Sequence, residues 1–105
     1  MPSAEKLASL SPQLVADVTM YATAAGGRKW PAHSSWGCPC CVSKMQPIVG
    51  YDGWPLLGDT TLNAGDRRRL GFVFSSPEAA AVMKSAGTFY LWEGGFVGEA
   101  KVVIE

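Results

Sequence analysis

The stretch that decides the fold is TFYLWEGGFVGEAKVVI, residues 88–104. Its first part, Thr88–Glu93, is rich in aromatic residues, which favours a β-strand. The Gly94-Gly95 pair that follows is a tight-turn signal. From Phe96 to Ile104, one set of alternating positions is apolar, as in a strand with one buried face; its members are Ala100, Val102 and Ile104. These features predict a β-hairpin that closes the domain.

Three other segments are expected to be strands. In Leu14–Thr23 every even-numbered residue is apolar, and in Arg67–Phe74 the apolar residues Leu70, Phe72 and Phe74 share one face with Arg68. A poorer strand is expected over Cys41–Val49, at an edge or a bulge, because its Pro47 cannot donate to a ladder. Residues 28–40 are expected to be irregular, and Asp52-Gly53 and Asn63–Asp66 are turn signals.

One helix is expected. Ser76 is a suitable N-cap, Pro77 suits the first helical position, and a helix through Lys84 would end at Gly87. Short connections favour pairing between strands adjacent in sequence. Five or six strands of this length close to hide their edges, which predicts an all-β, closed antiparallel barrel with one short helix. We expect residues 1–12 to form a lead-in and residues 13–105 to form a single barrel domain.

The composition excludes several classes of protein. The chain has 105 residues, with nine basic residues and nine acidic ones, so its formal net charge is zero. That balance argues against non-specific coating of nucleic acid, which depends on released counterions. The longest purely apolar run, Ala79–Met83, is too short to span a bilayer, and the N-terminus carries no secretion signal. The three cysteines are odd in number and clustered, which is not the pattern of a disulfide framework. Because such cysteines suit a reducing compartment, we expect a cytoplasmic protein.

The cysteine cluster is a candidate metal or redox site. Cys38, Cys40 and Cys41, with His33 upstream, are the right residue types for zinc, but the Cys-x-Cys-Cys spacing is not that of common zinc sites. The alternatives are that Cys41 packs in the core with the other two on a loop or strand face, or that the thiols have a redox role. A Cys38–His33 catalytic pair lacks a recognisable partner set. We therefore name no catalytic residue and no required cofactor.

Tryptophans and arginines are the candidate binding residues. Trp30, Trp36 and Trp54 lie in glycine- and proline-rich stretches, where a tryptophan either anchors an interface or covers the open end of a barrel. Exposed beside Arg28, they would suit stacking combined with charge, as in single-strand binders. The Arg67–Arg69 run is interpreted as solvated charge, because neighbouring residues on a strand cannot share a face.

The order of the motifs resembles a known family. Residues Ala24–Arg28, followed by Pro31 and a strand start at Pro39, are similar to the opening of the third, C-terminal domain of elongation factor Tu, with its Gly-Gly-Arg turn and Arg-Pro-Gln-Phe strand. Later motifs also resemble the family's, over about residues 13–104; they are Ala64-Gly65-Asp66, Ser76-Pro77-Glu78-Ala79, the Gly87–Gly95 hairpin, Val97-Gly98 and Val102-Val103.

The resemblance implies a six-stranded antiparallel barrel and kinship with translation factors, whose copy of this domain touches tRNA and protein partners. At the family's tRNA-contacting positions, Arg28, Glu93 and Gly94 match. Other positions have lost their polar groups: Cys38 and Cys40 replace an arginine and a glutamine, and Trp92 and Phe96 stand where arginines are expected.

The chain has no phosphate-binding glycine loop, so we expect neither GTPase activity nor nucleotide binding. Together these features predict a non-enzymatic binding module in a translation-related setting, with a protein partner or an RNA and no membrane. Its expected binding residues are Arg28, Trp30, Trp36, Trp92, Glu93, Gly94 and Gly95. The alternative is a zinc- or thiol-dependent protein that uses His33, Cys38, Cys40 and Cys41.

Overall fold

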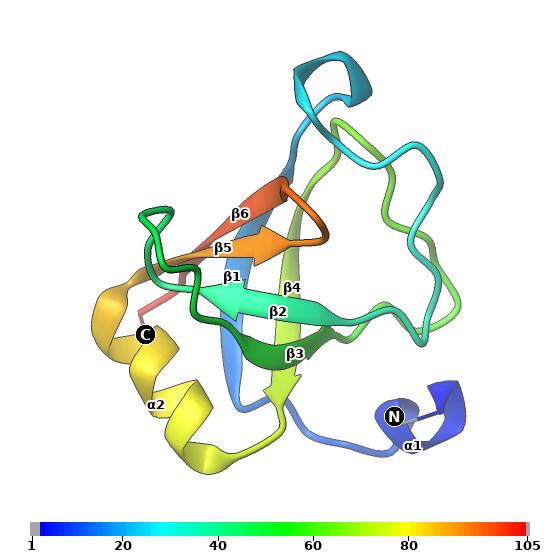
Figure 1. The fold of residues 1–105 in the computed structure, drawn as a ribbon. Helices are drawn as coiled ribbons and strands as arrows, with labels where there is room; N and C mark the ends of the chain where they lie inside the picture. The colour runs from blue at the N-terminus through cyan, green and yellow to red at the C-terminus, as the bar shows by residue number, and fades with distance from the viewer. Residues whose placement is uncertain (1–2, 105) are drawn as a thin grey trace.

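The computed structural model describes residues 3–104 and forms a closed barrel of six antiparallel strands (Figure 1). This confirms the expected all-β barrel. Met1 and Pro2 of the expected lead-in, and Glu105 at the end of the expected domain, lie outside the described residues. The elements are α1 (Ala4–Ala8), β1 (Leu14–Met20), a 3₁₀ turn (Thr23–Ala25), β2 (Cys38–Cys41), β3 (Tyr51–Pro55), β4 (Arg67–Phe74), α2 (Pro77–Ala86), β5 (Thr88–Trp92) and β6 (Phe96–Val102).

The strands follow the spatial order β1-β4-β3-β2-β5-β6, and the sheet closes because β1 pairs with both β4 and β6. Ala16 lies opposite Leu70 on one side and opposite Val102 on the other. The expectation that sequence neighbours pair is confirmed for β2–β3, β3–β4 and β5–β6 but is wrong for β1 and for the β2–β5 pair. Two long connections, residues 21–37 and 56–66, follow β1 and β3, and Ala32 of the first bridges Leu62 of the second. The first joins strands that are not neighbours in the barrel, whereas the second joins the paired strands β3 and β4.

The strand expected over Cys41–Val49 is wrong. The chain instead forms β2 from Cys38 to Cys41, a connecting loop, and β3 from Tyr51 to Pro55. Pro39 is tolerated within β2 because β5 pairs only with Cys40 and Cys41 on that side. Gly53, expected in a turn, lies in β3. The position suits glycine because a Cβ there would stand 2.7 Å from the Phe74 ring. Gly53 therefore admits an aromatic ring to the core.

The core fills the barrel from alternating strand positions. In β1 the buried residues are Leu14, Ala16, Val18 and Met20, as expected. The rings of Phe72, Phe74 and Phe89 pack together with centroids 5.2–6.0 Å apart. The inward position expected for Ile104 is wrong: its side chain is 90% exposed, because β6 ends at Val102.

The helix α2 confirms its expected signals. The Ser76 hydroxyl accepts a hydrogen bond from the Ala79 amide at 3.1 Å, Pro77 opens the first turn, and Gly87 ends the helix. Its buried residues, Ala79, Ala80 and Met83, join the core cluster. Within residues 3–104, no helix has the length and apolar character needed to cross a membrane.

The β5–β6 hairpin has a turn that depends on a left-handed residue. Trp92 pairs with Phe96, and the amide of Glu93 donates to the carbonyl of Gly95 at 2.8 Å. Gly94 has φ of +69°, where an L side chain is strained. Gly95 has no positive φ, and a Cβ at either glycine would meet no atom within 4 Å. The two neighbours therefore differ in backbone conformation and not in available space.

This pair of glycines gives a matched test of the turn. Gly94→Ala is expected to lower the free energy of unfolding by about 1–2 kcal/mol, the cost of left-handed backbone for an L residue. Gly95→Ala is expected to be neutral or to stabilise by up to about 1 kcal/mol, because it restricts the unfolded chain. Urea unfolding of both variants measures the difference. Equal losses in the two variants would contradict this turn geometry.

Candidate binding surface

The segment after β1 turns sharply and brings Arg28 back against the barrel. Gly26 ends the 3₁₀ turn with φ of +98°, and at Gly27 a Cβ would overlap the carbonyl oxygen of Tyr21. The Thr23 hydroxyl donates to the Arg28 carbonyl at 3.0 Å and fixes the exit of the turn. The Gly-Gly-Arg sequence thus works as a structural unit: the two glycines permit the close approach that positions the arginine.

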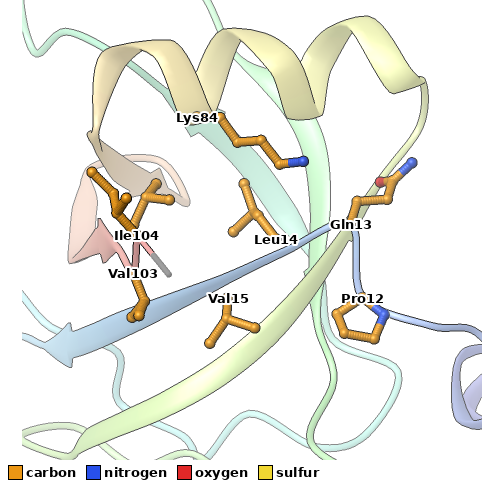
Figure 2. A pocket seen from close by; sticks show the side chains of 8 residues that line it. Pro12, Gln13, Leu14, Val15, Lys84, Val103 and Ile104 are labelled. Carbon is orange, nitrogen blue, oxygen red and sulfur yellow. The ribbon is translucent and has the colours of Figure 1, made fainter.

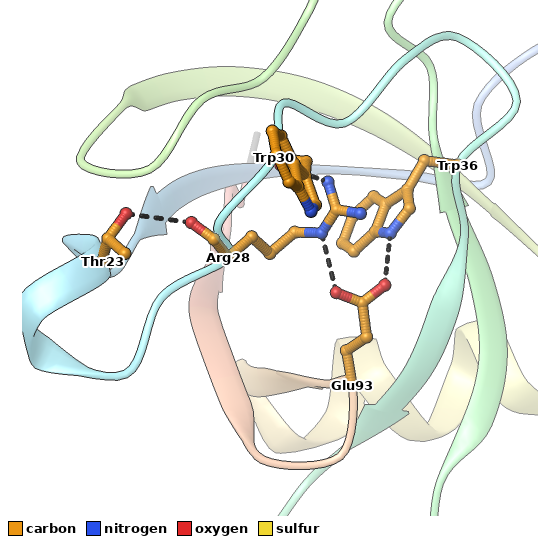
Figure 3. A network of polar contacts seen from close by, with 5 residues as sticks. All are labelled: Thr23, Arg28, Trp30, Trp36 and Glu93. Atoms are coloured by element: carbon orange, nitrogen blue, oxygen red, sulfur yellow. Dashed lines mark hydrogen bonds and ion pairs between the residues drawn. The ribbon is translucent and has the colours of Figure 1, made fainter.

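Arg28 is the centre of a network that joins the β1–β2 connection to the tip of the β5–β6 hairpin (Figure 3). Its Nε donates to Oε1 of Glu93 at 2.7 Å, and its Nη1 donates to the carbonyl of Trp30 at 2.7 Å. The guanidinium lies 5.1 Å from the ring centre of Trp36, within cation–π range. The Trp36 Nε1 group donates to Oε2 of the same Glu93 at 3.0 Å. Both carboxylate oxygens of Glu93 are therefore occupied.

The electrostatics hold Glu93 ionised. Burial favours the neutral form, but hydrogen bonds from Arg28 and Trp36 outweigh it and lower the pKa of Glu93 below its ordinary value of 4.5. The Arg28 side chain is only 15% exposed, whereas that of Glu93 is 42% exposed. The arginine is thus largely committed to internal partners, and the carboxylate is the more accessible charge.

The structure brings together four of the seven residues expected to bind a partner, namely Arg28, Trp30, Trp36 and Glu93. The other three, Trp92, Gly94 and Gly95, flank Glu93 at the tip of the β5–β6 hairpin. Trp92 packs edge-on against Phe96 with ring centroids 4.9 Å apart. We call these seven residues the hairpin surface.

The tryptophans divide between the two roles that the sequence left open. Trp36 is partly buried and packs against the core cluster, so it covers the barrel interior. Trp30 is 76% exposed and only its backbone carbonyl is held, by Arg28. Trp54 lies in β3 against Gly37, with its indole Nε1 group buried and without a hydrogen-bond partner in the structure. Trp30 is therefore the residue of the three best placed to contact a partner.

The cysteine cluster is divided between the two faces of β2. Cys38 and Cys40 belong to the core cluster, whereas Cys41 is buried outside it. Cys41 is buried, as one alternative expected. The same alternative is wrong for Cys38 and Cys40, which it placed on a loop or strand face: their side chains, at alternate positions, share the inner face. His33 is exposed on the preceding loop. Among residues 3–104, no three His, Cys, Asp or Glu side chains are grouped so as to hold a metal ion.

Two of the buried thiols, those of Cys40 and Cys41, also have raised pKa values. A hydrogen bond with Cys38, followed by burial, raises the pKa of the Cys40 thiol well above its ordinary value of 9.0. Burial, followed by the nearby Cys38, raises the pKa of Cys41. Because the thiolate is the reactive and metal-binding form, both shifts oppose thiol chemistry at neutral pH.

A pocket that the sequence analysis did not foresee lies at the start of β1, whereas the segment that carries Arg28 and Trp30 follows the end of that strand. It has a volume of about 550 Å³ and is lined by residues before and within β1, by Lys84 of α2 and by the C-terminal residues Val102–Ile104 (Figure 2). Its walls are mainly apolar, and Lys84 is the one ionisable side chain among its lining residues. Nothing in this pocket resembles a set of catalytic groups.

The arginine run on β4 is divided between two faces, as expected, but Arg68 and Arg69 have protein partners that the interpretation as solvated charge did not include. Arg69 makes a two-pronged contact with Asp17 of β1, at 2.8 Å and 3.1 Å, and Arg68 donates to the Thr61 carbonyl. Arg67 and Arg69 are exposed on one face, while Arg68 lies on the other. The run is therefore not a concentrated basic patch.

No protein-family model matches the chain, and no curated protein matches its sequence. The hairpin surface must therefore be interpreted from its own geometry.

The Arg28–Glu93–Trp36 network gives a pH-dependent contribution to stability. The folded-state pKa of Glu93 is lowered, so its contribution is present above pH 4.5 and is lost as pH falls through the lowered value. Because Glu93 is 42% exposed, solvent screens the pair, and Glu93→Gln is expected to cost about 0.5–1 kcal/mol at neutral pH. Urea unfolding across the acidic range should show the gap to wild type closing. A gap that stays constant in acid would contradict the ion pair.

The burial of the thiols predicts slow labelling. In the native protein, all three cysteines should react with a thiol reagent at least about a hundredfold more slowly than in the unfolded chain, because each must wait for the barrel to open. Reaction of any cysteine at the unfolded rate would contradict this placement. Stoichiometric zinc in metal analysis of the purified protein would also contradict the buried placement of the thiols, because bound zinc requires thiolates as ligands.

Proposed function

We propose that this protein is a non-enzymatic binding module that docks a protein partner on the hairpin surface. The observation that carries the proposal is Trp30, a large aromatic side chain left 76% exposed directly above an ordered Arg28–Glu93–Trp36 network. Exposed tryptophans supported by rigid neighbours are typical of interface hot spots. A surface that is already ordered loses little conformational entropy on binding, which favours affinity.

A protein partner is favoured over RNA by the state of Arg28. Two of its nitrogen atoms already donate within the protein, and its side chain is mostly buried. The more accessible charge beside it is the Glu93 carboxylate, which repels phosphate. The formal net charge of zero supplies no general attraction for nucleic acid either.

The proposal includes kinship with the third domain of elongation factor Tu and a translation-related setting in the cytoplasm. It is supported by the closed six-stranded barrel and by the position of Arg28, Glu93 and Gly94, the three matched residues, on one surface. Three cysteines within four residues suit a reducing compartment. The absence of a phosphate-binding loop from the sequence makes a role as a partner-binding domain more fitting than a role as a GTPase.

Trp30→Ala tests the proposal directly. Because the Trp30 ring is exposed, its removal should change the free energy of unfolding by no more than about 0.5 kcal/mol. In affinity capture from native lysate, the variant should recover the partner at least about tenfold less well than wild type, as expected for a hot spot. Ile104→Ala, which removes a side chain that is 90% exposed and lines the pocket at the start of β1, is the matched control and should retain the partner.

Nuclease treatment and a salt series separate protein from RNA in the same experiment. A protein partner should survive nuclease and depend weakly on salt. Recovery that nuclease abolishes, with affinity falling steeply as salt rises, would show an RNA ligand instead. Equal recovery by wild type and Trp30→Ala would overturn the hairpin surface as the docking site.

A further inference from the structure

Three aromatic rings on the outside of the barrel surround a lysine ammonium. The Nζ atom of Lys44 lies 5.0 Å from the ring centres of Tyr21 and Tyr90 and 5.3 Å from that of Phe96. A cation within about 6 Å of a ring centre is attracted to the electron-rich face. The ammonium is therefore in range of three rings at once, an arrangement that a solvated surface lysine does not require.

A hydrogen-bonded chain links the same lysine, whose residue is exposed, to β6. Lys44 Nζ donates to the Tyr21 hydroxyl at 2.8 Å, and that hydroxyl donates to Oε1 of Glu99 at 3.0 Å. The hydrogen bond with Tyr21 raises the pKa of Lys44, so the group is held as a cation. We call the set Tyr21, Tyr90, Phe96 and Glu99 the cation cage.

The cage belongs to the barrel, whereas its occupant belongs to a loop. Tyr90 and Glu99 are directly paired residues of β5 and β6, and the rings of Tyr90 and Phe96 are in edge contact at 6.1 Å. Each cage residue is partly buried. Lys44 lies within residues 42–47, all of which are exposed on the connection between β2 and β3. The cage can therefore keep its shape when the Lys44 side chain leaves.

We propose that the cation cage is a binding site for a primary or N-methylated alkylammonium group and that Lys44 occupies it as an internal competitor. Tyr90 and Phe96 face outward on strands, where polar side chains are usual, and Tyr21 lies just beyond β1; the three rings converge on a point where a compact cation already sits. Recognition of ammonium and methylated ammonium groups by aromatic cages follows from the same attraction. Lysine side chains of other proteins and free polyamines both carry this group.

The inference does not rest on the proposed function of the hairpin surface, because it concerns different side chains. It has a quantitative consequence. A ligand binds only the fraction of molecules in which Lys44 has left the cage, so its apparent affinity is reduced by that fraction. Removing Lys44 should therefore strengthen binding without adding any contact. A lysine that served only to anchor its loop would give no such gain.

The test is a titration of isotope-labelled wild-type protein and Lys44→Ala with tetramethylammonium chloride, followed by backbone amide shifts in NMR spectra. Sodium chloride at the same concentration controls for ionic strength, and tert-butanol controls for a neutral group of similar shape. Shifts should localise to Tyr90, Phe96 and Glu99, with an affinity at least about fivefold stronger in Lys44→Ala. Adding Tyr90→Leu to Lys44→Ala should abolish these amide shifts, while adding Trp30→Ala should leave them unchanged.

Two further titrants identify the source of the ammonium group. A short peptide with one trimethylated lysine represents a protein ligand, and spermidine represents a polyamine. The titrant that binds more tightly identifies the source of the ammonium group. Absence of cage shifts in Lys44→Ala, or shifts of equal size with tert-butanol, would overturn the site. Equal affinity in wild type and Lys44→Ala would overturn the competitor role. Because no partner protein is used, either result is independent of the Trp30 experiment.

Discussion

The pairing of β1 with both β4 and β6 is the constraint on which the rest of the structure depends. It joins the start of the chain to its end, leaves the sheet without a free edge, and fixes which side chains of every strand face inward. It also sets the position of the candidate sites. Just beyond β1, the Tyr21 amide donates to the Val97 carbonyl of β6, so the segment that follows must turn beside the hairpin tip. Closure thereby brings Arg28 and Glu93 together although they are 65 residues apart in sequence.

The Arg28 side chain then converts this proximity into an ordered surface. Its guanidinium forms an ion pair with Glu93, donates a hydrogen bond to the backbone carbonyl of Trp30, and makes a cation–π contact with the ring of Trp36. These contacts engage two of its nitrogen atoms and pair its charge with Glu93, but they leave the Trp30 ring in solvent. Cys38 and Cys40, by contrast, lie in the core cluster, and Cys41 is buried outside it; the pKa values of the Cys40 and Cys41 thiols are raised. Buried cysteines pack as small apolar groups. The hairpin surface therefore presents an exposed aromatic ring beside an ordered ion pair.

The sequence predicted the elements whose signals are local. Alternation located β1 and β4, and capping residues located α2. The sequence-based prediction failed where the structure depends on distant residues. Cys38–Cys41 forms a strand, despite Pro39, because it pairs with a strand on each side. The partners of β1 are likewise not specified by the alternation of apolar residues. Of the hairpin surface, Arg28 and Glu93 came from the family resemblance and the tryptophans from composition. The cation cage was not foreseen, because Lys44 meets rings from three other segments and nothing local distinguishes it from a solvated lysine.

The central claim is that a protein partner contacts the surface at Trp30. Residue 30 is replaced with a photo-crosslinking phenylalanine analogue, and residue 104 with the same group in a second sample. This compares, in the native cell, one exposed position in the β1–β2 connection with one just beyond β6. The account predicts a discrete, nuclease-resistant protein adduct from position 30 and none from position 104. Equal adducts from both positions, or an adduct from position 104 alone, would contradict it.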